Sequence, residues 1–159
     1  MDTRFIELKN NRKCYVDNGL VSSYEGMERE FVCDDTVSGI IDEISCNYLS
    51  HKNIIKKTTT TLEAILDKFN APSIIDYLSL DVEGHEFDIL STFPFDKYKF
   101  RCITVEHNLP TCGPFNRMRI RRILEDNGYT FIKGNDNVQN WTHVNGQPID
   151  DFYVLSDRI

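Results

Sequence analysis

A short apolar stretch near the middle of the chain, residues 74–80, runs into a group of ionisable side chains. The group surrounds Gly84 and consists of Asp81, Glu83, His85 and Glu86. An apolar run that ends before a glycine is typical of a buried central strand. Open α/β sheets bind ligands beyond the carboxyl ends of such strands. The pattern therefore predicts an active-site edge with carboxylates and an imidazole available for acid–base chemistry.

A second pair of such residues, Glu106 and His107, follows the apolar stretch 100–105. The carboxyl ends of neighbouring parallel strands meet at one edge of a sheet, so we expect this pair to lie near Asp81. Asp81, Glu106 and His107 are therefore the predicted catalytic residues, able to take a proton from a hydroxyl group. The same groups with Glu83 would also suit Mg²⁺, Mn²⁺ or Zn²⁺, although their spacing is not diagnostic and the preferred interpretation assigns no metal.

Each acid also has a structural interpretation. Asp81 could cap the helix that follows it, and Glu83 or Glu86 could gain from the dipole of that helix. Glu106 could be neutralised by Arg101 or by a backbone amide. Because acids at strand ends in such sheets commonly face the ligand crevice, we favour function for Asp81 and leave Glu106 open between the two roles.

The elements around these residues alternate between strands and helices. Residues 54–59 are β-branched and predict a strand, and Thr60 or Thr61 is a suitable N-cap for a helix over 62–69. With the strand at 74–80, this segment predicts a right-handed parallel β-α-β crossover.

Further elements follow from the same patterns. Upstream, the predicted strand 13–21 is followed by a hairpin strand at 29–33. Downstream, the predicted elements are a helix at 84–92, a strand at 100–105, a helix at 114–127 with Gly128 at its C′ position, and closing strands at 129–133 and 152–155. The alternation predicts an α/β fold with a largely parallel sheet.

Three blocks of sequence, at 61–66, 80–86 and 103–107, resemble the S-adenosylmethionine-dependent methyltransferases of the FkbM type in order and spacing. The resemblance implies a Rossmann-like sheet, mostly parallel, with antiparallel closing strands. The first two strands of that sheet and its Gly-rich cofactor loop have no counterpart here. The expected organisation is therefore a single FkbM-like domain over residues 1–159, N-terminally incomplete and with an open sheet edge.

The resemblance also implies an activity. The expected reaction is methyl transfer from S-adenosylmethionine to a hydroxyl group of a sugar or related metabolite, with the acceptor pocket in loops 34–53 and 109–115. The residues that the resemblance assigns to cofactor binding are Val21, Ser22, Asp81, Glu83 and Gly84. Methyl transfer of this kind depends chiefly on alignment of the reacting atoms and on removal of the hydroxyl proton.

Two other classes of function remain open. In the first, the chain is a non-catalytic remnant whose open sheet edge binds a second copy or another chain. In the second, Asp81, Glu83, Glu106 and His107 hold a cation that activates water in a hydrolase. A metal requirement would distinguish the hydrolase from a simple methyltransferase.

Composition limits the partners. The net charge of −7 argues against nucleic-acid binding, which needs clustered lysine and arginine. The densest basic run, residues 117–122, has helical spacing and is interpreted as a solvated helix face balanced by Glu125 and Asp126.

Compartment is predicted from the cysteines and from hydropathy. The five cysteines are odd in number and widely separated, which favours a reducing compartment. No apolar run is long enough for a membrane span, and the N-terminus lacks the hydrophobic region of a signal peptide. The expected location is cytoplasmic, with no membrane partner.

Overall fold

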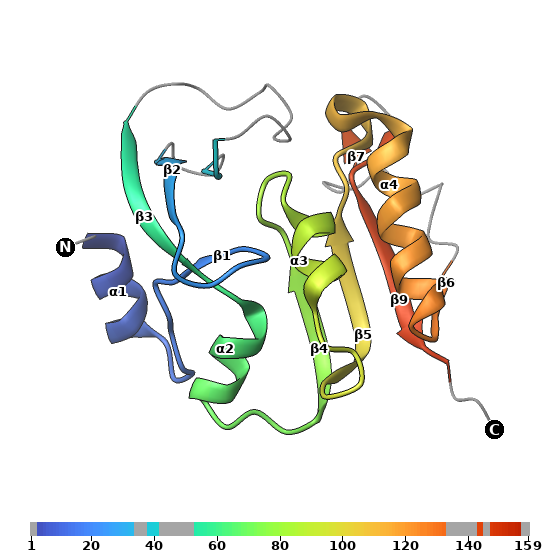
Figure 1. Cartoon of the computed structure of the whole chain (residues 1–159), viewed down its shortest axis with the longest axis horizontal. Coiled ribbons are helices and arrows are strands. Elements are labelled where there is room, and N and C mark those ends of the chain that lie inside the picture. The colour runs from blue at the N-terminus through green and yellow to red at the C-terminus, as the bar shows by residue number, and fades with distance from the viewer. Residues whose placement is uncertain (1–2, 34–37, 42–52, 133–142, 145–146, 157–159) are drawn as a thin grey trace.

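The computed structural model describes residues 3–33, 38–41, 53–132, 143–144 and 147–156. Its first part forms a small three-stranded sheet in the order β1-β3-β2 (Figure 1). The elements of this part are α1 (Thr3–Asn11), β1 (Leu20–Val21), β2 (Glu28–Val32) and β3 (Ile54–Thr60). Strand β1 is parallel to β3, and β2 is antiparallel to it. The expected strand at 13–21 is thus confirmed only at its last two residues, and α1 was not predicted.

The second part contains a four-stranded sheet in the order β4-β5-β9-β6. Its elements are α2 (Leu62–Lys68), β4 (Ile74–Leu80), α3 (Glu86–Thr92), β5 (Lys99–Glu106), α4 (Leu109–Asp126), β6 (Tyr129–Ile132) and β9 (Asp150–Leu155). Strands β4 and β5 are parallel, whereas β9 is antiparallel to both of its neighbours. A separate antiparallel pair is formed by β7 (His143–Val144) and β8 (Gln147–Pro148).

Local signals in the sequence predicted two of the helix ends correctly. The Thr61 side chain accepts a hydrogen bond from the Ala64 backbone N–H at 3.1 Å, which confirms the predicted N-cap of α2. Gly128 follows the C-cap of α4 with a φ of 87°, a left-handed conformation that glycine adopts without steric cost. Helix α4 begins earlier than expected and is kinked at Gly113.

The predicted β-α-β crossover is wrong, because β3 and β4 lie in different sheets. Strand β3 pairs with β2 over residues 54–58 and with β1 at Thr59 and Thr60, so its strand partners lie in the smaller sheet. Strand β4 is consequently an edge strand rather than a central one, with Ile74 51% and Tyr77 55% exposed. An open sheet edge was expected, and β4 supplies it. The sheets are mixed, so the expectation of a mostly parallel sheet is also wrong.

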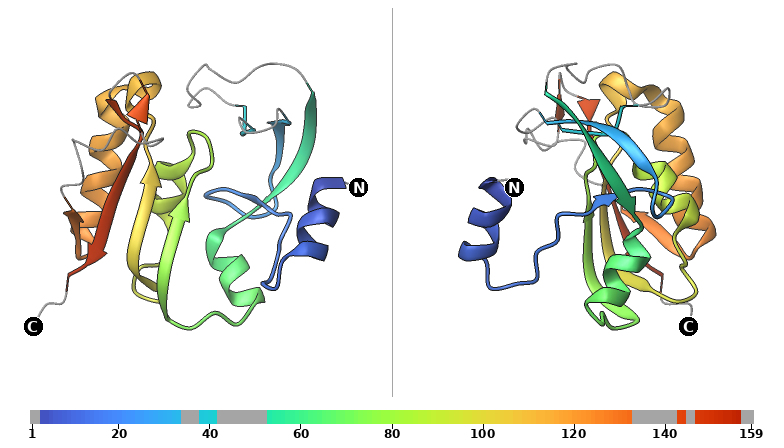
Figure 2. Two further views of the ribbon diagram at one scale, coloured as in Figure 1. Left: turned by 180° about the vertical axis from the view of Figure 1, so that it is seen from behind. Right: turned by 60° about the vertical axis from the view of Figure 1, so that its left-hand side comes forward.

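The main core lies between the four-stranded sheet and the helices α3 and α4, which cover the same face (Figures 1 and 2). The aromatic side chains after α3 belong to this core: they are Phe93, Phe95, Tyr98 and Phe100. The ring centroids of Phe93 and Phe100 are 5.4 Å apart. Burial of each such ring contributes on the order of 2 kcal/mol before the entropic cost of ordering.

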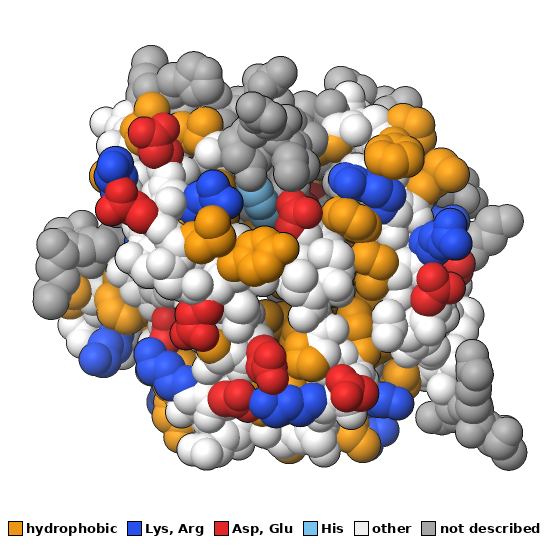
Figure 3. Space-filling model, in the orientation of Figure 1, with side chains coloured by type: hydrophobic (Ala, Val, Ile, Leu, Met, Phe, Trp, Pro, Cys, Tyr) orange, Lys and Arg blue, Asp and Glu red, His pale blue; other side chains and the backbone are white. Residues whose placement is uncertain are grey.

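The outer surface carries charges of both signs. Figure 3 shows acidic and basic side chains interspersed on the face seen in Figure 1. The Lys97 ammonium group, for example, lies 2.8 Å from carboxylate oxygens of both Glu63 and Asp67. Helices able to cross a membrane are absent from the described part of the chain, as none there combines the length and apolar character required.

The cysteines do not all behave as expected. Cys112 is disulfide-bonded, whereas Cys14, Cys33 and Cys102 are free and exposed, and Cys46 lies outside the described residues.

Candidate functional site

The parallel pairing of β4 and β5 places their carboxyl ends side by side, with Leu80 opposite Val105. Asp81 and Glu106 end these two strands, and Glu83 follows in the loop after β4. One carboxylate oxygen from each of these three residues lies within 4.8 Å of the others. We call Asp81, Glu83 and Glu106 the acidic cluster. The structure therefore brings together two of the three predicted catalytic residues.

The loop after β4 holds its acids by an unusual backbone. Glu83 and Gly84 have φ angles of 58° and 111°, both in the left-handed region. The Glu86 carboxylate accepts hydrogen bonds from the backbone N–H groups of Val82 and Gly84 at 2.9 and 3.2 Å. Because α3 begins only at Glu86, Glu83 is a loop residue rather than part of the helix. Glu86 thus has the structural role that was expected for one of the two glutamates.

Burial controls the ionisation of Glu86. Removal of its side chain from water raises its pKa from 4.5 to about 7, although the hydrogen bonds from Val82 and Gly84 oppose the shift. The negative charge of Asp81 adds to the increase. Glu86 therefore changes its charge near neutral pH.

Glu106 is the most enclosed member of the acidic cluster, with only 8% of its surface exposed. Its Oε1 atom accepts a long hydrogen bond of 3.4 Å from Asn108, and among the described residues its buried Oε2 atom has no hydrogen-bond partner. Arg101, the expected partner, instead lies 3.3 Å from Asp76, so that interpretation is wrong. Burial and then the charges of Asp81 and Glu83 raise the pKa of Glu106 well above its usual range.

His107 is directed toward a different part of the sheet. Its Nδ1 atom accepts a hydrogen bond from the Leu109 backbone N–H at 3.2 Å, and its Nε2 atom lies 3.5 Å from Asp151 Oδ1. The side chain is fully buried. His107 therefore contacts Asp151, and the structure shows no contact between its ring and the acidic cluster.

Asp151 is buried, and its role was not predicted from the sequence. The Arg117 guanidinium group donates to both of its carboxylate oxygens at 2.6 and 2.9 Å, and Arg121 donates at 3.2 Å. The interpretation of 117–122 as a solvated face is therefore wrong for these two arginines. The sequence does show the acidic pair at 150–151. It does not show which residues pair with Asp151, because Arg117 and Arg121 lie 30 or more positions earlier.

The charge of Asp151 is favoured by this surrounding network. Burial alone would raise the pKa of Asp151, but His107 and the two hydrogen bonds from Arg117 outweigh it and hold that pKa below its usual range. We call Asp151, Arg117, Arg121 and His107 the Asp151 network. It joins β9, α4 and the end of β5.

His85 is enclosed beside the acidic cluster. Only 4% of its surface is exposed, and its Nδ1 atom lies 3.5 Å from a carboxylate oxygen of Asp88. It stands at the N-cap of α3 without a side-chain capping bond. This placement agrees with a packing role.

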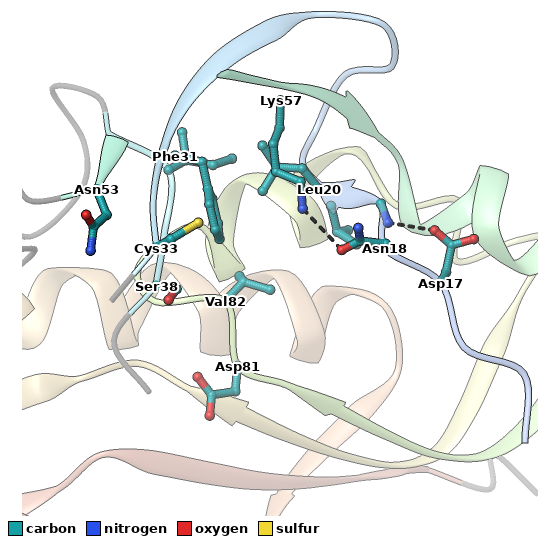
Figure 4. A pocket seen from close by; sticks show the side chains of 13 residues that line it. Asp17, Asn18, Leu20, Phe31, Cys33, Ser38, Asn53, Lys57, Asp81 and Val82 are labelled. Atoms are coloured by element: carbon teal, nitrogen blue, oxygen red, sulfur yellow. Dashed lines mark hydrogen bonds between the residues drawn. The ribbon is translucent and has the colours of Figure 1, made fainter. Parts of the chain in front are cut away.

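A cavity of about 670 Å³ lies next to Asp81, between the three-stranded sheet and the end of β4 (Figure 4). Figure 4 shows Phe31 and Lys57 projecting from β2 and β3, opposite Asp81 and Val82. Val21, one of the predicted cofactor-binding residues, also lines the cavity. Apolar, aromatic, amide and carboxylate groups thus surround a space of the size that small ligands occupy.

The strand that forms one wall of this cavity is closely packed. A Cβ atom at Gly19 would lie 2.6 Å from Thr60 Cγ2 and 2.9 Å from Asp17 Oδ1, so only glycine fits there without movement. Ser22, another predicted cofactor-binding residue, is buried, and its backbone N–H donates to the Thr60 carbonyl at 2.9 Å. Ser22 therefore holds β1 against β3.

A comparison with protein-family models decides the relationship. The methyltransferase FkbM domain matches residues 14–131, which is more than half of the 159-residue chain. The chain belongs to the FkbM methyltransferase family. The matched part of this FkbM protein includes the acidic cluster and the described walls of the cavity. Searches of the curated proteins and of the solved structures found no significant match.

Proposed function

We propose that this FkbM protein transfers a methyl group from S-adenosylmethionine to a hydroxyl group of a sugar or related metabolite. The observation that supports this best is the position of Asp81, which both lines the cavity and belongs to the acidic cluster. One side chain thus connects a ligand-sized space to groups able to accept a proton.

The residues of the cavity fit the cofactor. S-adenosylmethionine, when bound, supplies an electrophilic methyl group on a positively charged sulfur. The Asp81 carboxylate offers the negative charge that such a group favours, and Leu20, Val21 and Phe31 offer apolar surface for a planar base. Asn18 adds an amide that can bind polar groups of the ligand.

Within this proposal, the acidic cluster handles the proton of the acceptor. As the acceptor oxygen gains its methyl group, its proton passes to a carboxylate oxygen of Asp81, the exposed member of the cluster. Buried Glu106 lies beside Asp81 in the acidic cluster, with carboxylate oxygens within 4.8 Å of one another. His107, which contacts Asp151, positions the chain after β5.

Isothermal titration of the purified chain with S-adenosylmethionine and S-adenosylhomocysteine tests the proposal. We expect saturable binding that weakens about tenfold or more in Asp81→Asn, equivalent to about 1.4 kcal/mol. Asp76→Asn is the matched control, because Asp76 is 96% exposed and lies far along β4 from the site. Formation of S-adenosylhomocysteine with hydroxylated sugars would then identify the acceptor. A well-folded chain that binds neither compound would overturn the proposal.

The exposed edge of β4 supports a second candidate function, the binding of another strand. An edge with exposed Ile74 and Tyr77 presents unpaired backbone groups and apolar surface, which invite pairing with a second copy or with another chain. Light scattering across a concentration series tests self-pairing, with Ile74→Lys as the disrupting variant. A mass equal to one chain at every concentration would exclude the second copy as the occupant.

A further inference from the structure

We propose that Asp81, Glu83 and Glu106 bind a hard divalent cation, such as Mg²⁺ or Mn²⁺, at the carboxyl ends of β4 and β5. The proposal rests on geometry, burial and donor chemistry, and none of the three depends on the identity of the methyl acceptor.

The spacing of the three carboxylates fits one central ion. Their oxygens lie within 4.8 Å of one another. Oxygen ligands stand about 2.0–2.6 Å from hard divalent cations, so two ligands on opposite sides of an ion are about 4–5 Å apart. A single ion can therefore contact all three side chains with little movement of the backbone.

The burial of Glu106 is an independent indication. Its side chain is 8% exposed, and its Oε2 atom is buried without a hydrogen-bond partner among the described residues. A buried carboxylate oxygen that lacks a partner is costly, because it has lost its water and gained nothing in return. A cation coordinated at this oxygen would supply the missing interaction.

The charge balance points the same way. In the part of the chain that the structure describes, no lysine or arginine forms an ion pair with Asp81 or Glu106. Asp151, by contrast, has two arginine partners. A divalent cation would offset the repulsion between the carboxylates of Asp81 and Glu106.

The donor set selects the class of metal. All three side chains offer carboxylate oxygen, and the cluster contains neither a cysteine nor a histidine. Oxygen donors suit Mg²⁺, Mn²⁺ and Ca²⁺, whereas Zn²⁺ favours nitrogen and sulfur. Asp81 is exposed and lines the cavity, so the ion has an entry path and a side open to a ligand.

If the proposed methyl transfer holds, the open side of the ion would receive the acceptor oxygen. A bound cation favours the deprotonated form of a coordinated hydroxyl, which would make that oxygen a better nucleophile. This consequence rests on the proposed function. The cation site itself does not.

Titration of the whole chain with Mn²⁺, followed by electron paramagnetic resonance of the unbound ion, tests the site. We expect saturable binding of one Mn²⁺ per chain, weakened at least tenfold in Asp81→Asn and in Glu106→Gln. The exposed acids Asp76 and Glu63 provide the controls, because Asp76→Asn and Glu63→Gln should leave binding unchanged. Competition by Mg²⁺ and Ca²⁺ would establish the class of ion.

Two results would overturn the cation proposal: no saturable Mn²⁺ binding by a well-folded chain, or equal binding by all four variants. Circular dichroism establishes folding, and Asp81→Asn changes an exposed side chain. The titration contains no S-adenosylmethionine. Mn²⁺ binding without cofactor binding would therefore contradict only the proposed function, and cofactor binding without Mn²⁺ binding would contradict only the cation site.

Discussion

The acidic cluster and the Asp151 network lie at the same end of one sheet, but their buried carboxylates have opposite electrostatic surroundings. In the pairing of β5 with β9, Asp151 lies opposite Val105, one residue before Glu106. Asp151 is 2% exposed and receives hydrogen bonds from two arginines. Glu106 is nearly as enclosed, yet its nearest charged neighbours are other acids.

Asp151 is neutralised by partners within the fold, whereas ionised Glu106 has a charge that a bound ligand could neutralise. The chain's own cations stabilise the ionised form of Asp151, and its pKa falls. Burial and then the charges of the neighbouring acids oppose ionisation of Glu106, and its pKa rises. Unfavourable local charge is costly to a fold and is concentrated at functional sites. The contrast supports the proposal that the acidic cluster binds a ligand and that the Asp151 network stabilises the fold.

Removal of the Asp151 charge should have the largest effect. Asp151→Asn leaves Arg117 and Arg121 half-buried without their partner, and we expect a loss of about 3 kcal/mol in the free energy of unfolding. Urea denaturation at pH 7 measures it. Asp76→Asn removes an exposed charge and serves as the control. A loss in Asp151→Asn no larger than in the control would remove the structural role assigned to this network.

Stability should depend on pH in opposite directions at the two sites. The pKa of Glu86, beside the acidic cluster, is raised from 4.5 to about 7, so its contribution to stability is lost as pH rises through this interval. Relative to Glu86→Gln, the native protein should lose on the order of 2 kcal/mol between pH 4.5 and pH 7.5. The glutamine can still accept the hydrogen bonds from Val82 and Gly84.

Asp151 produces the opposite dependence at acid pH. Its pKa is lowered in the folded state, so its contribution is lost as pH falls below about 4. Urea denaturation of the native protein, Glu86→Gln and Asp151→Asn across pH 3–8 measures both pH dependences of the free energy of unfolding. Parallel curves for the native protein and Glu86→Gln from pH 4.5 to pH 7.5 would show that burial of Glu86 is not costly.

Neighbouring arginines on α4 allow a finer comparison. Arg121 contacts Asp151 and lies over the Phe131 ring at 3.7 Å, so Arg121→Ala should lower stability by about 1–2 kcal/mol. Arg122 is largely exposed and lies 3.8 Å from Asp126, so Arg122→Ala should have no measurable effect. Thermal unfolding of the two variants provides the test. Equal losses would mean that helix propensity, rather than the Asp151 contact, sets the effect.

Substitution of His107 has the smallest expected effect. It tests whether this residue belongs to the Asp151 network or to the acidic cluster. Because its Nδ1 atom accepts the Leu109 hydrogen bond, His107→Gln should lower stability by about 1 kcal/mol. Mn²⁺ binding should be unchanged, since the ring is directed toward Asp151. Paired urea and Mn²⁺ titrations measure both properties. Loss of Mn²⁺ binding with unchanged stability would transfer His107 to the acidic cluster.

Local pattern was enough to predict most elements and part of the site. The Thr61 cap, the glycine after α4 and the apolar runs of β4 and β5 each depend on neighbouring residues, so the sequence displays them directly. Asp81 and Glu106 were predicted to meet because they end neighbouring strands. Glu83 joins them through its left-handed backbone, which its residue type does not indicate.

Long-range pairing could not be predicted in the same way. Whether β3 joins β4 or forms a sheet with β1 and β2 depends on competition among distant strands, which the β-branched pattern of 54–59 does not resolve. Asp151 and Arg117 likewise lie 34 positions apart, and only the folded chain brings them together. The basic run on α4 therefore looked solvated when half of it is not.

The close packing at Gly19 has a consequence for the tolerance of this chain to substitution. An added methyl group there meets Thr60 Cγ2 at 2.6 Å, so Gly19→Ala alone should be rejected. Serine at position 60 lacks that methyl group, although the 2.9 Å approach to Asp17 Oδ1 remains. Alanine should thus be less costly at position 19 once position 60 has changed. The effects of these two substitutions are therefore not additive. The cost of alanine at position 19 depends on which residue is already present at position 60.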